Sequence, residues 1–107
     1  MENEYCQVVT TVRSRADGDE LARGVVEARL AACAQVLGPL ASTYWWHEAI
    51  ETAEEWQVVF KTTTVRFPAL RDFIRIHHDY EVPEILCVPV LEGNPAYLRW
   101  IDAETAA

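Results

Sequence analysis

The sequence has little lysine, little glycine and no long hydrophobic run. Lys61 is the only lysine among 107 residues, and the arginines are scattered along the chain without forming a cluster. Nucleic acids and anionic membranes are bound by clustered positive charge, so this pattern argues against both as partners. No segment approaches the roughly 18 apolar residues that indicate a membrane span. The formal charge of −8 instead favours cations as ligands.

Signals for secretion and for disulfide or zinc scaffolds are also missing. The first residues, MENEYCQVV, lack a basic stretch followed by an apolar one, so we expect a cytoplasmic protein. Cys6, Cys33 and Cys87 are odd in number and widely spaced, which argues against a disulfide framework or a structural zinc site. We expect Cys6 and Cys87 to lie in the core as small hydrophobic residues.

Motifs that carry catalysis are absent as well. The chain has no nucleophile elbow, no glycine-rich phosphate loop and no metalloprotease motif, and its four glycines are isolated. We therefore expect a binding protein rather than an enzyme.

The apolar pattern predicts a single domain over residues 1–107. We expect strands at 5–12, 34–46, 55–63 and 83–91, helices at 20–33 and 66–78, and a short closing helix at 93–101. Asp17 and Glu20 resemble a capping box at the start of the first helix. Its apolar stripe comprises Leu21, Val25, Ala28 and Ala32.

This order of elements is that of a ferredoxin-like βαββαβ sandwich, an α+β fold with spatial strand order 4-1-3-2. Proline within a sheet is confined largely to edges and bulges. Pro39 and Pro89 fall in the second and fourth strands, which this topology places at the edges. The prolines therefore support the fold independently of the apolar pattern.

The second and third strands predict a long hairpin. Residues 40–50 and 53–63 would each extend about 36 Å, whereas a globule of this size is about 34 Å across. The hairpin carries Tyr44, Trp45, Trp46 and Trp56, and an acidic turn region is expected between Glu48 and Glu55. Because an overhanging ribbon with so many rings exposes much apolar surface, we expect a closed homo-oligomer that covers it.

Five ordered stretches, VVEARLAAC, STYWW, FKTT with RFPAL, HDYEVPEI and GNPAYLRWI, resemble the CutA divalent-cation tolerance family. The resemblance covers nearly the whole chain. It implies a ferredoxin-like subunit assembled as a tight homotrimer, similar in architecture to the PII signalling proteins, and a link to divalent metals, copper in particular. The chain has His47-Glu48-Ala49 where the family reads E-G-K, and this departure is expected to remove a tight turn from the hairpin.

The resemblance implies a metal site with His78, and Cys33 or Glu81 as further ligands. Imidazole and carboxylate ligands suit copper or zinc, and a thiolate favours Cu(I). Under the alternative interpretation, His78 caps the C-terminus of its helix and the glutamates face water or arginines. His77 and His78 are adjacent on a predicted helix, so we expect their side chains to point about 100° apart and not to share a site. No cofactor is expected to be obligatory.

A ligand cleft between subunits is expected to contain Trp46, Lys61, Tyr80 and Glu84. Lys61 is expected either to pair with an acidic residue or to bind an anionic group of a ligand. The two rings are expected to line the cleft or to pack against a neighbouring subunit.

Two functions follow as expectations. The first is a CutA-like homotrimer that binds a divalent metal, such as copper, or a small ligand between its subunits. The second is a PII-like signalling or scaffolding trimer whose main partner is another protein.

Overall fold

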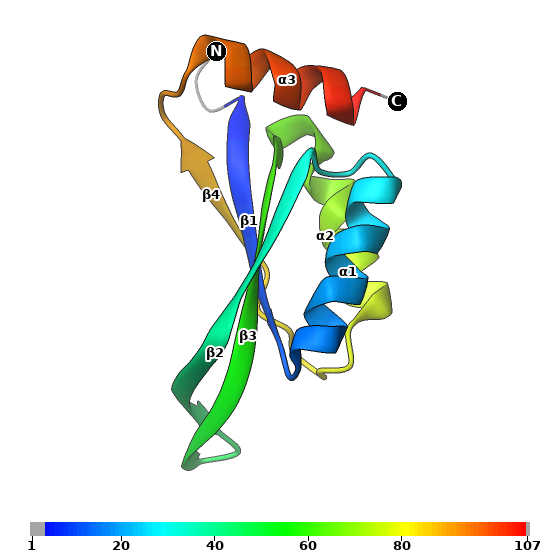
Figure 1. The fold of residues 1–107 in the computed structure, drawn as a ribbon. Coiled ribbons are helices and arrows are strands. Elements are labelled where there is room, and N and C mark those ends of the chain that lie inside the picture. The colour runs from blue at the N-terminus through cyan, green and yellow to red at the C-terminus, as the bar shows by residue number, and fades with distance from the viewer. Residues whose placement is uncertain (1–3, 107) are drawn as a thin grey trace.

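The computed structural model describes residues 4–106 and shows a four-stranded antiparallel sheet with α1 and α2 on one face (Figure 1). In chain order the elements are β1 (Tyr5–Val12), α1 (Arg15–Glu27), β2 (Cys33–Trp46), β3 (Ala49–Thr63), the 3-10 turn η1 (Thr64–Arg66), α2 (Phe67–His77), β4 (Leu86–Val90) and α3 (Pro95–Thr105). The strand order is β2-β3-β1-β4. The predicted α+β topology is therefore confirmed, and Pro39 and Pro89 lie on the two edge strands.

The core lies between the sheet and the two helices. Its main buried side chains are Cys6, Val8, Thr10 and Val12 of β1, Val58, Phe60 and Thr62 of β3, Leu21 and Val25 of α1, and Leu70 and Ile74 of α2. Alternate residues of each central strand face the helices, as the period of two predicts. Burial of each large apolar side chain contributes about 1.5 to 3 kcal/mol, so this layer holds the sheet and helices together.

Helix α1 begins earlier and ends earlier than predicted. Ser14 is the N-cap, since its Oγ accepts a hydrogen bond from the Asp17 amide at 3.0 Å, and the expected capping box of Asp17 and Glu20 is wrong. After Glu27 the helix closes with backbone bonds from Arg29 to Val26 and from Leu30 to Val25. Arg29 takes a left-handed φ of 63°, the position usually occupied by glycine in this type of helix end.

The early end of α1 changes the role of the following residues. Ala28 is exposed and Ala32 lies outside the helix, so the apolar stripe stops at Val25. Cys33 starts β2 instead of ending α1. The apolar run misled the prediction because its alanines suit a helix, whereas tertiary structure requires a reversal before β2.

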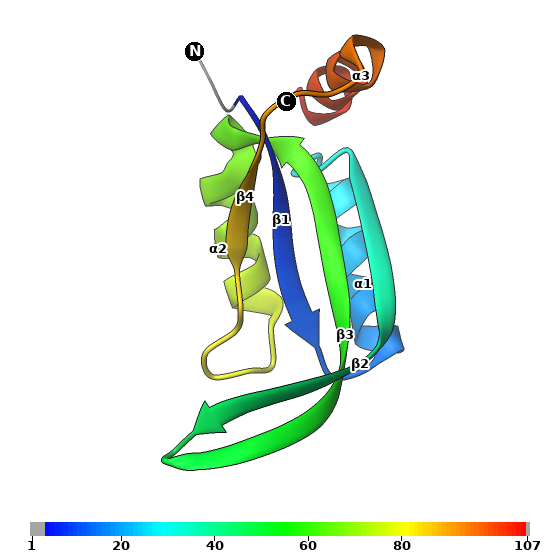
Figure 2. The same cartoon turned by 90° about the vertical axis from the view of Figure 1, so that its left-hand side faces the viewer.

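The hairpin of β2 and β3 is longer than the body of the domain. Its strands are joined by a two-residue turn at His47 and Glu48, with φ values of 50° and 66°, as in type I′ turns. The tight turn is therefore kept without glycine, and residues 49–55, expected in an acidic turn region, continue β3. The molecule measures 44 × 25 × 22 Å, and the far end of the hairpin curves beneath the loop between α2 and β4 (Figure 2).

The edge strand β4 is shorter than predicted, because residues 83–85 belong to the preceding loop. Cys87 is exposed, contrary to the expectation of a core position, since β4 has a neighbour on one side only. Helix α3 is attached by Arg29 to Glu104 and by Arg66 to the Thr105 carbonyl. Among the described residues, no helix combines the length and apolar character needed to cross a bilayer.

Candidate functional site

The main candidate site is a groove of about 630 Å³ beneath the curved hairpin. Three segments form its walls: the distal part of β2 and β3, the end of β1, and the loop after α2. It includes Trp46, Tyr80, Glu81 and Glu84, which the sequence assigned to a ligand or metal site. The fold thus brings together four of the seven predicted site residues.

The groove depends on Glu55, a residue that sequence reasoning missed. Its side chain is only 7% exposed, and its Oε2 accepts a hydrogen bond of 2.7 Å from the Tyr80 hydroxyl. Burial and this hydrogen bond to Glu55 raise the pKa of Tyr80 above its ordinary value. No sequence signal separates Glu55 from Glu51 and Glu54, because its burial results from the hairpin curving under the loop.

The groove holds excess negative charge. Burial, and then the nearby Glu55 carboxylate, raise the pKa of Glu84. Within residues 4–106, no lysine or arginine lies within 4.0 Å of the carboxylates of Glu55, Glu81 or Glu84. Arg13 also lines the groove, but its guanidinium lies over the Tyr80 ring, 5.7 Å from the centroid. A bound cation would therefore find carboxylates that the chain itself does not neutralise.

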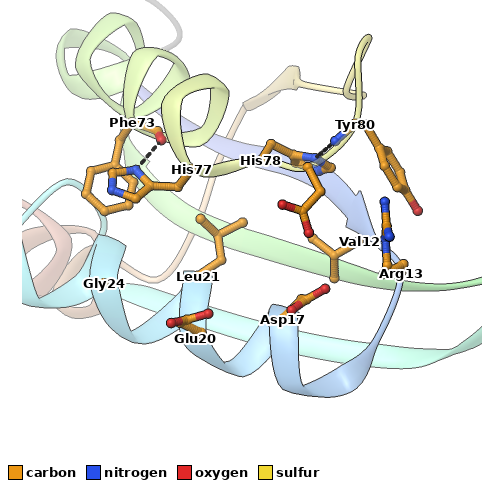
Figure 3. A pocket seen from close by; sticks show the side chains of 11 residues that line it. Val12, Arg13, Asp17, Glu20, Leu21, Gly24, Phe73, His77, His78 and Tyr80 are labelled. Atoms are coloured by element: carbon orange, nitrogen blue, oxygen red, sulfur yellow. Dashed lines mark hydrogen bonds between the residues drawn. The ribbon is translucent and has the colours of Figure 1, made fainter.

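His78 has both ring nitrogens engaged. Its Nε2 lies 2.7 Å from the Thr11 carbonyl oxygen and must donate, because a carbonyl only accepts. Its Nδ1 then accepts from the Tyr80 amide at 3.0 Å (Figure 3). The imidazole is thus the neutral Nε2–H tautomer and fixes the loop to β1, and a metal could bind it only by displacing one of these bonds.

A second hollow of about 300 Å³ lies between α1 and the end of α2, and Tyr80 borders both hollows. His77 and His78 both line it, contrary to expectation (Figure 3). The helical spacing of 100° does not apply because His78 is already extended, with φ −97° and ψ 142°. The ring of His77 stacks on Phe73 at 4.1 Å, and its Nδ1 binds the Phe73 carbonyl at 2.8 Å.

Cys33 and Lys61 lie away from the groove. They pair with each other across β2 and β3, whereas Thr11, the partner of His78, pairs with Gln57 four residues earlier on β3, roughly 13 Å along the strand. The Lys61 ammonium donates to the Gln35 amide oxygen at 2.8 Å, so the expected pairing with an acidic residue is wrong. One chain therefore does not unite Cys33 with His78 and Glu81, and the described residues contain no group of three or more metal-ligating side chains.

The chain resembles known proteins along most of its length. The family model described as CutA1 divalent ion tolerance protein matches residues 6–104. Divalent-cation tolerance protein CutA of Thermus thermophilus is 39% identical over 98 residues, covering 92% of this chain and 95% of that protein. The crystal structure of CutA1 from Shewanella sp. SIB1 superposes with a TM-score of 0.95 at 31% identity, covering 100% of both chains.

Some relatives are longer or carry a compartment in their names. Protein CutA of mouse is 44% identical over 86 residues, which are 80% of this chain, and the chain spans about half the length of this relative, 49%. A structure from Archaeoglobus fulgidus, titled as a periplasmic divalent cation tolerance protein CutA, superposes with a TM-score of 0.93 at 30% identity, covering 95% and 99% of the chains. The family thus occurs in different settings with the same fold.

Proposed function

Because the chain belongs to the CutA1 divalent ion tolerance family, we propose that it assembles as a homotrimer and binds a divalent cation in the groove beneath the hairpin. The observation that carries this proposal is the buried Glu55 carboxylate beside Glu84, without a cationic partner among the described residues. Copper is our leading candidate among divalent metals. The proposed activity is binding, not catalysis.

The electrostatics of the groove support a cation. A buried carboxylate is costly unless it is paired or coordinates a metal, and Glu55 has only the neutral hydroxyl of Tyr80. Glu81 and Glu84 offer further oxygen atoms on the opposite wall. For a given set of nitrogen and oxygen ligands, Cu²⁺ generally binds more tightly than the other divalent first-row metals, which favours copper.

The surface of the hairpin supports assembly. Trp45 and Ile50 are 71% and 62% exposed and lie opposite each other near the turn. A soluble chain rarely leaves such a patch uncovered. In a trimer a neighbouring copy would cover it and could bring its own Cys33 or Lys61 to the groove, so that the site would lie between subunits.

The cation proposal is tested by calorimetric titration with Cu²⁺. We expect the double variant Glu81→Gln and Glu84→Gln to lose about tenfold or more in affinity, because two carboxylates of the groove become neutral. Glu92→Gln is the matched control, since Glu92 is exposed and does not line the groove. Equal affinity of the double variant and the wild type would remove the proposed site.

The assembly proposal is tested by native mass spectrometry and light scattering on protein purified without an affinity tag. We expect a particle of three chains of 12.2 kDa, and bound-metal analysis of the same particle identifies the metal. A dominant species of one chain in dilute neutral buffer would contradict it.

Exposed apolar side chains outside the hairpin favour a second candidate, a signalling or scaffolding trimer with a protein partner. Ile76 on α2 is 77% exposed. Pull-down with the trimer in chelator distinguishes the two functions, because a specific partner retained without metal supports the scaffold.

We place the protein in the cytoplasm as part of the proposal. The structure has no disulfide among its described cysteines, and Cys6, Cys33 and Cys87 are all free thiols, as reducing compartments maintain. Cell fractionation of the untagged protein in its native host would test this, and recovery from a periplasmic or organelle fraction would contradict it.

A further inference from the structure

Two of the three cysteines lie side by side on neighbouring strands. In the pairing of β1 with β4, Cys6 lies opposite Pro89 and Val8 lies opposite Cys87. Residues opposite each other point to the same face of a sheet, so Cys6 and Cys87 are diagonal neighbours on the face that the helices cover. The pair lies at the start of β1, five residues and roughly 17 Å from Thr11, which lines the groove.

The two thiols differ in exposure and interact directly. Cys6 is 1% exposed, whereas Cys87 on the edge strand is open to solvent. Burial and the Cys87 thiol raise the pKa of Cys6 to about 12, while Thr64 lowers it. At neutral pH the Cys6 thiol is therefore protonated, and Cys87 is the side through which a reagent can approach.

We propose that Cys6 and Cys87 form a two-coordinate site for a soft monovalent cation, Cu(I) or Ag(I), which is separate from the groove proposed above. Thiolates are soft ligands that select Cu(I). A structural zinc site would need four ligands, and within residues 4–106 no third histidine, cysteine or carboxylate joins this pair. On binding, two metal–sulfur bonds form and two thiol protons leave to solvent, and the metal keeps its oxidation state.

The test is an anaerobic titration of the reduced protein with Cu(I), in competition with a coloured Cu(I) chelator. EDTA is added to suppress divalent ions at the groove. We expect the wild type to bind one Cu(I) per chain and Cys87→Ser to lose about a hundredfold or more in affinity. Cys33→Ser is the matched control, because Cys33 lies on β2, contacts Tyr97 and is not part of the pair.

A second measurement guards against misfolding of the buried variant. Cys87 is exposed, so Cys87→Ser should retain the circular dichroism spectrum and the native mass of the wild type. X-ray absorption of the Cu(I) protein should show two sulfur neighbours. The proposal is overturned if Cys87→Ser binds as tightly as the wild type, if Cys33→Ser abolishes binding, or if the reduced wild type binds no Cu(I). Because the variants and the metal differ, either proposal can fail without the other.

Discussion

One hydrogen bond, from the Tyr80 hydroxyl to Glu55, connects the loop after α2 to the hairpin. On the same loop, His78 binds the Thr11 carbonyl and the Tyr80 amide. These bonds hold Tyr80 between the two hollows and fix the wall of the groove. Single side chains thus define the candidate site, and changes to them should have separable effects on stability.

Tyr80→Phe should destabilise the fold by about 1 to 3 kcal/mol, because Glu55 loses its hydrogen-bond donor while it stays buried. Chemical denaturation of the wild type and the variant measures the difference in the free energy of unfolding. Tyr44→Phe is the control, since Tyr44 lines the same groove and donates no hydrogen bond among the described residues. An equal cost for both variants would contradict the importance of the Tyr80 bond.

Stability should fall as the pH rises above about 10, and part of this fall should depend on Tyr80. The pKa of Tyr80 is raised in the folded state, so the folded protein holds the phenol proton more tightly than the unfolded chain. This contribution is complete below the unfolded pKa of about 10 and is lost as the pH approaches the folded pKa. Urea denaturation between about pH 8 and pH 11 should show a steeper fall for the wild type than for Tyr80→Phe. Parallel curves would contradict the assignment.

Helix α1 and the hairpin are both terminated by residues other than those the sequence suggested. Serine at position 14 begins the helix, and arginine at position 29 takes the left-handed conformation that ends it. His47 and Glu48 take the same conformation at the hairpin turn. In each case tertiary contacts impose a backbone conformation against local preference.

Ser14→Ala should cost about 1 kcal/mol, because the Asp17 amide loses its side-chain acceptor. Glu20→Ala should change stability by less than about 0.5 kcal/mol, since Glu20 is exposed and forms no ion pair within the described chain. Thermal and urea unfolding of the two variants compare these costs. A larger effect at Glu20 would restore the capping box that the sequence suggested.

Glu48→Gly should stabilise the hairpin by about 0.5 kcal/mol. Glycine relieves the strain of a left-handed residue, about 1 to 2 kcal/mol, but loses more entropy on folding. Hydrogen exchange of the amides in the distal hairpin reports the local effect. Ala49→Gly, at the first position of β3, is the control and should destabilise by about 0.5 to 1 kcal/mol.

The complete chain has an elongated shape because the hairpin continues past the helices (Figure 1). The exposed pair of Trp45 and Ile50 lies at this far end. Such a surface is economical only if another copy covers it, as proposed above.

A charge at this pair should therefore weaken assembly. We expect Trp45→Glu with Ile50→Glu to shift the particle towards the 12.2 kDa chain on sizing with light scattering. Ile76→Glu, at an exposed apolar position of α2, is the control and should keep the wild-type mass. If the control dissociates the particle and the hairpin variant does not, the interface lies on the helices instead.

The sequence was sufficient for the strand order, since the apolar alternation of β1 and β3 and the edge prolines depend on local rules. The groove was only partly predictable. Tyr80 and Glu84 were found through family resemblance, but Glu55 is buried by a curvature that arises between segments far apart in the chain. Cys87 was misjudged for a similar reason, because exposure at a sheet edge depends on what packs there and not on residue type.

Pro39 and Pro89 also limit how copies of the chain can meet. Each lacks a backbone N–H and lies on one of the two outer strands, and Pro39 lies at a break in the register between Leu37 and Leu40. Neither rim can template a continuous ladder with an incoming strand, so unlimited growth into an amyloid-like filament is obstructed from both sides.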